Sequence, residues 1–249
     1  MTERTTLTPA EAWQQLVEGN ARFVTGRREH PNQDVDRRAE LAAGQGPFAV
    51  LFGCSDSRVA AEMIFDQGLG DLFVVRTAGH VLDPCVLGTV EFGPGVLGTP
   101  LIVVMGHDTC GAIKAGIEAT DTGTIPGGYI RDLVEKVMPS VIQARSSHGA
   151  GPDATPDEVN AWHVRRTVNM LAERSALLQQ LVEDGRLAIV GINYRLADGD
   201  VRYIAHLGDI GDARPGIDVA PGVGAAPGVG TGPGGGTGPG GGTAPGVGA

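Results

Sequence analysis

Two short segments of the sequence carry residues that can bind one metal ion together. Cys54 lies in the first segment, and His107 and Cys110, three residues apart, lie in the second. Thiolate and imidazole groups suit zinc better than magnesium or calcium, and Cys, His and Cys form a known ligand set of catalytic zinc that leaves the fourth position to water. Singly, each residue is more often a buried packing residue. Together, they predict a three-ligand zinc site.

Charged residues follow Cys54 closely. Asp56 and Arg58 are two residues apart on an expected tight turn, so their side chains can form a bidentate ion pair beside the metal. Arg58 would hold Asp56 ionised and oriented toward zinc-bound water; an ordinary surface ion pair is the alternative. We interpret Asp108 as the cap of a following helix rather than as a catalyst, and Cys85, which has no local partner, as a buried free thiol.

The elements that must position these residues are the strands of a predicted α/β sheet. Nearly continuous apolar runs are typical of buried parallel strands, and the chain has four, at residues 48–52, 72–75, 101–105 and 187–192. Crossover helices are expected around residues 59–65, 84–97 and 110–119. An antiparallel edge strand is expected at residues 201–206. Cys54 and His107 each follow a strand, at the sheet edge where α/β proteins bind ligands.

Helices are expected near both ends of this strand-rich region. Thr8 and Glu11 form a capping box that opens an amino-terminal helix, with Pro9 in its first turn. Between residues 155 and 184, apolar residues recur at helical spacing. We predict one long helix or two shorter ones there, which cover a sheet face or pack across a subunit interface.

The composition divides the chain into two parts. It has 249 residues, with 19 Lys and Arg against 29 Asp and Glu, and every charge lies in residues 1–218. Residues 219–249 contain only Gly, Pro, Ala, Thr and Val, with a proline every six residues in a hexad pattern. Such a segment has too little side-chain area to offset the cost of ordering its backbone. We predict a catalytic domain at 1–218 and a disordered low-complexity tail at 219–249.

The composition also excludes several classes of protein. The formal net charge of −10 disfavours nonspecific binding to nucleic acid or anionic membranes. The apolar runs are too short to span a bilayer, and residues 1–9 lack the apolar core of a signal peptide. Three widely spaced cysteines argue against a disulfide framework. A cytoplasmic location, where thiols stay reduced, is therefore expected.

The two segments with the metal-binding residues resemble a known family. CSDSR at residues 54–58 and HDTCG at residues 107–111 are similar to the paired signatures of the β-class carbonic anhydrases, in particular of actinobacterial members. The resemblance runs from about Leu7 to Gly211 and includes RTAGH at residues 76–80 and GGY at residues 127–129. The tail lies outside it.

The resemblance implies a fold, an activity and a set of site residues. The implied fold is a mostly parallel central sheet flanked by helices, with an antiparallel edge strand. The implied reaction is reversible hydration of carbon dioxide to bicarbonate and a proton, by attack of zinc-bound hydroxide on CO2 in an apolar pocket. One zinc ion per chain, active sites at a dimer interface, and a homodimer or homotetramer are also implied.

Individual residues take roles by the same resemblance. The zinc ligands would be Cys54, His107 and Cys110, and the catalytic pair Asp56 and Arg58. Substrate contacts would come from Gln45, which hydrogen-bonds substrate or bicarbonate, from Phe73, an aromatic wall of the pocket, and from the backbone N–H of Gly111. For Gln45 and Phe73, a loop residue and a core strand residue are the respective alternatives.

Some features stay open at this stage. Leu51 stands where some members carry a tryptophan of an inhibitory bicarbonate site, so the resemblance does not predict that site here. A carbon disulfide or carbonyl sulfide hydrolase on the same scaffold, a noncatalytic bicarbonate-binding or zinc-storage protein, and a scaffold protein built on the tail are alternatives. Residue type alone leaves four candidates for a proton shuttle: His30, His80, His163 and His206.

Overall fold

A five-stranded sheet forms the centre of the described chain. The computed structural model describes residues 7–146 and 149–216, so the predicted tail at 219–249 lies outside the described residues. The strand order is β2-β1-β3-β4-β5. The strands are β1 (Ala49–Cys54), β2 (Leu72–Thr77), β3 (Leu101–His107), β4 (Ala188–Tyr194) and β5 (Val201–Leu207). The first four are parallel and β5 runs antiparallel to β4, which confirms the predicted sheet and its edge strand.

Helical segments connect and cover these strands. The α-helices are α1 (Pro9–Val24), α2 (Val35–Glu40), α3 (Ala61–Ile64), α4 (Pro84–Phe92), α5 (Gly111–Thr122), α6 (Ile130–Arg145), α7 (Pro156–Arg174) and α8 (Ala176–Glu183). Tighter or wider helical turns form η1 (Leu41–Ala43), η2 (Ala78–His80) and η3 (Gly93–Leu97). Within residues 7–146 and 149–216, none of the helices combines the length and apolar character needed to cross a membrane.

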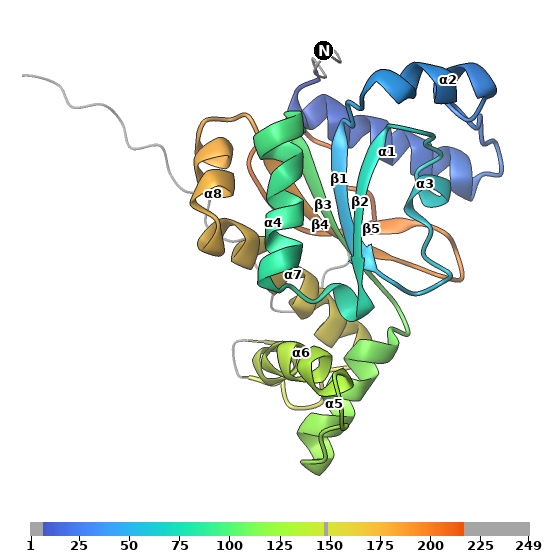
Figure 1. The fold of residues 1–249 in the computed structure, drawn as a ribbon. Coiled ribbons are helices and arrows are strands. Elements are labelled where there is room, and N and C mark those ends of the chain that lie inside the picture. Colours follow the sequence, from blue (N-terminus) through green and yellow to red (C-terminus); the bar gives the residue numbers. More distant parts are fainter. Residues whose placement is uncertain (1–6, 147–148, 217–249) are drawn as a thin grey trace, which may run out of the picture.

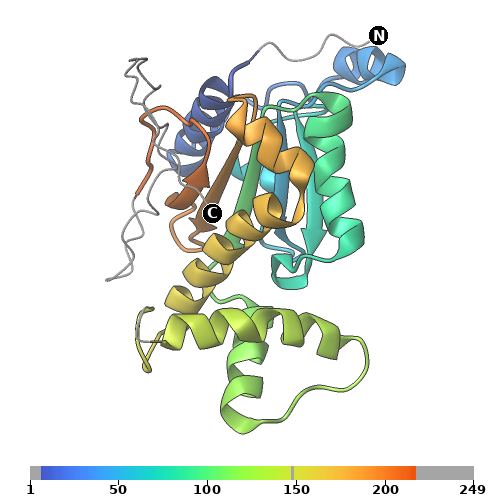
Figure 2. The same ribbon diagram turned by 90° about the vertical axis from the view of Figure 1, so that its left-hand side faces the viewer.

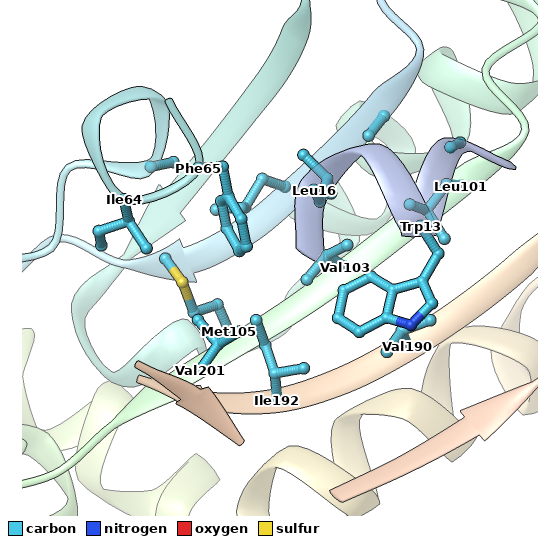
Figure 3. Packing of buried hydrophobic residues seen from close by; sticks show 14 of the residues in the cluster. Trp13, Leu16, Ile64, Phe65, Leu101, Val103, Met105, Val190, Ile192 and Val201 are labelled. Atoms are coloured by element: carbon cyan, nitrogen blue, oxygen red, sulfur yellow. The ribbon is translucent and has the colours of Figure 1, made fainter. Parts of the chain in front are cut away.

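Different helices bury the two faces of the sheet (Figure 1). On one face, Trp13 and Leu16 of α1 and Phe65 after α3 pack against alternate residues of the strands (Figure 3). On the other face, α4, α7 and α8 cover the remaining strand residues. Val103 therefore faces one cluster and its neighbour Val104 the other. Burial on both faces explains why the strands are continuous apolar runs rather than alternating ones.

Local capping groups set the helix ends. The predicted capping box of α1 is present, because Thr8 Oγ1 accepts from the Glu11 N–H at 3.2 Å while Glu11 Oε2 accepts from the Thr8 N–H at 2.8 Å. The apolar stretch at 155–184 forms two helices. Ser175 separates them, since it ends α7 and its hydroxyl accepts from the Leu178 N–H at 3.1 Å to cap α8.

Helices α5 and α6 form a lobe beyond the carboxyl ends of the strands (Figure 2). Sequence analysis did not predict α6, although Val134, Val137 and Val141 recur at helical spacing within it and are buried. A Cβ on Gly116 of α5 would lie 2.5 Å from a methyl carbon of Val137, so glycine allows the close approach of α5 and α6. Residues of this lobe form a third buried cluster, which includes Cys54 and Cys110.

Candidate metal centre

The candidate site lies where the winding of the sheet changes sides. β1 lies between β2 and β3, so the chain crosses from β1 to one neighbour and then back past β1 to the other. The carboxyl ends of strands at such a point are where α/β proteins bind ligands. Cys54 is the last residue of β1 and His107 is the last residue of β3. Cys110 occupies the N-cap position of α5. The topology thus brings three residues from two distant segments to one place.

The geometry of the three residues fits a metal ion. One ligand atom from each of Cys54, His107 and Cys110 lies within 4.8 Å of the others, and all three side chains are buried. The two sulfur atoms are 4.0 Å apart. Two thiolates bound to one tetrahedral zinc ion at the usual Zn–S distance have sulfur atoms about 3.8 Å apart. The donor set and the sulfur spacing therefore suit zinc.

The orientation of His107 supports the same conclusion. Its Nδ1 lies 2.8 Å from the carbonyl oxygen of Asp108, and because that oxygen only accepts, Nδ1 carries the hydrogen. In the neutral ring, Nε2 then presents a lone pair. This atom is buried and has no hydrogen-bond partner among the described residues. A buried acceptor without a partner costs about 1–3 kcal/mol, and coordination of a metal ion would satisfy it.

Hydrogen bonds also converge on the two sulfur atoms. The Gly79 N–H donates to Cys54 Sγ at 3.2 Å, and the N–H groups of Ala112 and Ile113 in the first turn of α5 point at Cys110. The Cys110 thiol donates a hydrogen bond to the Cys54 sulfur, and this bond lowers the pKa of Cys54. The same hydrogen bond, together with burial, raises the pKa of Cys110. One thiolate forms readily, and a cation is needed to stabilise the second beside it.

The predicted pair of Asp56 and Arg58 is present beside these ligands. Arg58 donates from Nε to Asp56 Oδ1 at 2.9 Å and from Nη2 to Oδ2 at 2.7 Å. The bidentate guanidinium holds the pKa of the Asp56 carboxyl well below its usual range. Asp56 Oδ2 lies 4.0 Å from His107 Nε2. A carboxylate that stays ionised therefore borders the metal-binding group.

Arg76, at the end of β2, fixes the turn that carries this carboxylate. Its Nε donates to the Cys54 carbonyl at 2.8 Å and its Nη2 donates to the Asp56 carbonyl at 2.6 Å. Sequence analysis gave Arg76 no role, although it begins the RTAGH segment quoted for the family resemblance. Its two donors clamp the backbone on both sides of Ser55.

Two predictions about single side chains are wrong. Asp108 does not cap α5; its carboxylate accepts from the Leu196 N–H at 3.0 Å, because Thr109 at φ +53° turns the chain between Asp108 and the helix. Cys85 is exposed rather than buried. It lies in the first turn of α4, where Val86 takes the position that faces the core.

The residues expected to contact substrate lie in different places. Gly111 is the first residue of α5, next to Cys110, and a Cβ there would meet no atom within 4 Å. Gln45 is exposed and precedes β1, at the end of the strand opposite to Cys54. Phe73 pairs with Val50 in the first half of β2 and stacks on Phe92, with ring centroids 6.0 Å apart. One chain alone does not bring Gln45 or Phe73 to the metal-binding group.

Two of the four histidines considered as proton shuttles are inaccessible to solvent. His80 and His163 are 0% and 1% exposed, so neither can exchange protons with bulk water in this chain. His206 is partly exposed on β5, where its ring is hydrogen-bonded to the Tyr203 hydroxyl, and His30 is exposed before α2.

Leu51, which stands where some family members carry a tryptophan, is a core residue. It is buried in the cluster under α1.

Comparisons with known proteins agree with this geometry. The family model described as carbonic anhydrase matches residues 49–201. The chain is 55% identical over 204 residues to carbonic anhydrase 2 of Mycobacterium tuberculosis, which is 82% of this chain and 97% of that protein. It is 54% identical to a carbonic anhydrase of Mycolicibacterium smegmatis, with the same coverage. These relatives confirm the resemblance to actinobacterial members.

Solved structures show the same fold. The β-carbonic anhydrase of Coccomyxa in complex with acetazolamide matches with a TM-score of 0.58 and 26% identity, over 67% of this chain and 75% of that one. The β-carbonic anhydrase CcaA matches with a TM-score of 0.61 and 23% identity, over 79% of this chain and 98% of that one. With its sequence relatives, its fold and its Cys54, His107 and Cys110 group together, the chain belongs to the β-carbonic anhydrase family of enzymes.

Proposed function

We propose that this protein catalyses the reversible hydration of carbon dioxide to bicarbonate and a proton, with one zinc ion per chain held by Cys54, His107 and Cys110. The observation that carries the proposal is the convergence of these three ligands beside an ion-paired carboxylate. The curated relatives named carbonic anhydrase support it. Catalysis is assigned to residues 1–218, which hold every residue of the site.

The residues of the chain have distinct parts in this reaction. When bound, zinc supplies Lewis-acid chemistry that lowers the pKa of water toward neutrality. Asp56, ionised through Arg58, accepts a hydrogen bond from the attacking water and orients it toward carbon dioxide. Because Arg58 engages both carboxylate oxygens, it also keeps Asp56 from binding the metal as a fourth ligand. The Gly111 N–H, next to Cys110, faces the substrate in this proposal.

We also propose that a second copy of the chain completes the site, in a homodimer or homotetramer. Gln45 and Phe73 have substrate-binding roles in this proposal, yet both lie away from Cys54 in the same chain. β1 alone spans about 17 Å between its two ends. A neighbouring copy can bring its own Gln45 and Phe73 to the carboxyl ends of β1 and β3, and the half-buried edge strand β2 is available for such contact.

The thiolate ligands set a requirement on the compartment. Cys54 and Cys110 bind metal only when reduced, and their sulfur atoms are already close together. A reducing compartment protects both thiols from oxidation. We therefore propose that the protein acts in the cytoplasm.

The test is stopped-flow carbon dioxide hydration against pH, on protein whose zinc content is measured. We expect about one zinc per chain and activity that rises toward alkaline pH. Cys110→Ser should lose zinc, because it removes a ligand. Asp56→Asn should keep zinc and lose about 100-fold in rate, in the range of positioned proton-transfer groups. Asp121→Asn is the matched control, since Asp121 also pairs with an arginine, Arg145, but on the exposed face of α5.

Other outcomes would lead to other functions. Full zinc occupancy with no hydration at any pH would refute the proposal. Hydrolysis of carbon disulfide or carbonyl sulfide by the same preparation would then identify the sulfur-substrate alternative. A zinc-loaded protein without turnover of any of the three substrates would be a noncatalytic bicarbonate-binding or zinc-storage protein.

A further inference from the structure

A buried histidine of α7, His163, makes two hydrogen bonds that fix its tautomer. Its Nε2 lies 2.9 Å from the carbonyl oxygen of Gly79, and its Nδ1 lies 2.8 Å from the hydroxyl of Ser140 in α6. Because a carbonyl oxygen only accepts, Nε2 carries the hydrogen. In the neutral ring, Nδ1 then accepts from Ser140. His163 is therefore a donor directed at Gly79.

Gly79 links this histidine to the metal-binding group. Its carbonyl accepts from His163, and its N–H donates to Cys54 Sγ at 3.2 Å. Gly79 has φ +66° and ψ +24°, and a Cβ there would lie 2.6 Å from the Cβ of Ala112 in α5. Hydrogen bonds to both of its polar groups, with α5 packed against its Cα, thus hold this residue in a left-handed conformation.

The hydrogen bonds of His163 distinguish it from a residue that only fills space in the core. An imidazole costs free energy to bury unless both of its nitrogens find partners, and here both do. The neighbouring His80 ring, 4.5 Å away between centroids, has no hydrogen-bond partner for either nitrogen in the part of the chain that the structure describes. Burial lowers the pKa of His163 to about 4, so the ring is neutral near pH 7. Its role is that of a fixed donor.

We propose that His163 is a positioning residue for the Cys54 thiolate: by holding the Gly79 carbonyl, it keeps the Gly79 N–H directed at the sulfur. The inference rests on the proposed function, because it requires Cys54 to bind the metal as a thiolate. A hydrogen bond to a thiolate withdraws electron density from the sulfur and fixes its direction. Residues that hydrogen-bond or orient the metal ligands, without touching the metal themselves, tune the metal affinity of a site in this way.

Cobalt replacement provides a readout other than activity. In the full-length protein loaded with Co²⁺, the thiolate-to-metal charge-transfer band reports how strongly sulfur donates electrons, and chelator competition reports Zn²⁺ affinity. His163→Leu removes the donor with a small change in volume. We expect its charge-transfer band to move to lower energy and its zinc affinity to fall about 10- to 100-fold.

Two variants serve as controls. His163→Gln places an amide N–H near the position of Nε2, so it should restore the band position and the affinity. Thr167→Val removes a buried hydrogen bond one turn further along the same helix, from Thr167 Oγ1 to the His163 carbonyl, without touching Gly79. It should leave the band and the affinity at their wild-type values even where it lowers stability.

The outcomes separate this inference from the proposed function. A wild-type band and affinity in His163→Leu would overturn the inference and leave the function standing. Equal changes in His163→Leu and Thr167→Val would overturn it as well, since the effect would be general destabilisation. A wild-type protein that binds neither metal would overturn both. If His163→Leu does not fold, Ser140→Ala is the deciding variant, because it removes the hydrogen bond that holds the His163 ring through Nδ1. Its charge-transfer band should move to lower energy by less than that expected for His163→Leu, and an unmoved band would overturn the inference.

Discussion

The buried ring of His163 makes stability depend on pH in a defined window. Burial, with a smaller contribution from the charge of Arg166, lowers its pKa to about 4, although the Gly79 carbonyl acts in the opposite direction. In the unfolded chain the pKa of histidine is about 6.5. Between these values the unfolded chain binds more protons than the folded one. The contribution of neutral His163 is therefore fully present above pH 6.5 and is lost as the pH falls toward 4.

The size of the effect follows from this difference in pKa. One pKa unit corresponds to about 1.4 kcal/mol. Lowering the pH from 7 to 5 should therefore remove about 2 kcal/mol of unfolding free energy through His163 alone. His80 acts in the same direction, because burial also lowers its pKa, and it is present in every variant compared.

The assay is urea unfolding of the full chain at pH 7, 6 and 5, at constant ionic strength and protein concentration. His163→Gln removes the titrating group, so its unfolding free energy should fall by about 2 kcal/mol less than that of the wild type between pH 7 and 5. Thr167→Val, which removes no titrating group, should run parallel to the wild type at every pH. If His163→Gln loses stability as steeply as the wild type, the reasoning is refuted.

Three further changes test other parts of the molecule. Gly79→Ala should lower the unfolding free energy by about 1–3 kcal/mol, measured in urea, and weaken zinc binding, because φ is +66° and the new Cβ meets Ala112. Asp66→Asn should lower it by about 3 kcal/mol, with hydration rate per bound zinc unchanged, because the buried carboxylate pairs with Arg22 at 2.6 Å. Deletion of residues 219–249 should change neither the number of subunits, determined from the mass of the assembly, nor the hydration rate.

For each of these three predictions, one outcome would contradict the reasoning. Unchanged stability and zinc affinity in Gly79→Ala would show that the turn adapts to a side chain. The Asp66 carboxylate also accepts from the Glu29 and His30 N–H groups, so a fully stable Asp66→Asn would mean that hydrogen bonds to the backbone suffice without the charge. A smaller assembly after the deletion would identify the tail as an assembly element rather than an extension.

Strand positions were predictable because their signals are local. A strand buried on both faces must be apolar at consecutive positions, so the runs at 48–52 and 101–105 marked β1 and β3 within two residues. The capping box of α1 also lies within four consecutive residues, and it forms as predicted. Helix α6 was missed although its apolar spacing is regular. It contains Pro139, which lacks a backbone donor and disfavours a helix interior.

Predictions about the direction of single side chains were less successful. Cys85 proved exposed because the phase of α4 gives the core position to Val86, and composition does not fix that phase. Asp108 turns to the loop after β4 because the φ of Thr109 is positive, and a threonine gives no sign of this in the sequence. Both outcomes depend on contacts with parts of the chain distant in sequence.

The sequence by itself indicated which residues could bind a metal ion and that they follow two strands, because ligand chemistry and strand periodicity are properties of short segments. Only the tertiary structure decided that Cys54, His107 and Cys110 meet within 4.8 Å, since this depends on β1 and β3 being neighbours. It alone placed the His163 donor on Gly79, 84 residues away in the chain. Such a contact is set by how α7 and η2 pack together, and no local pattern records it.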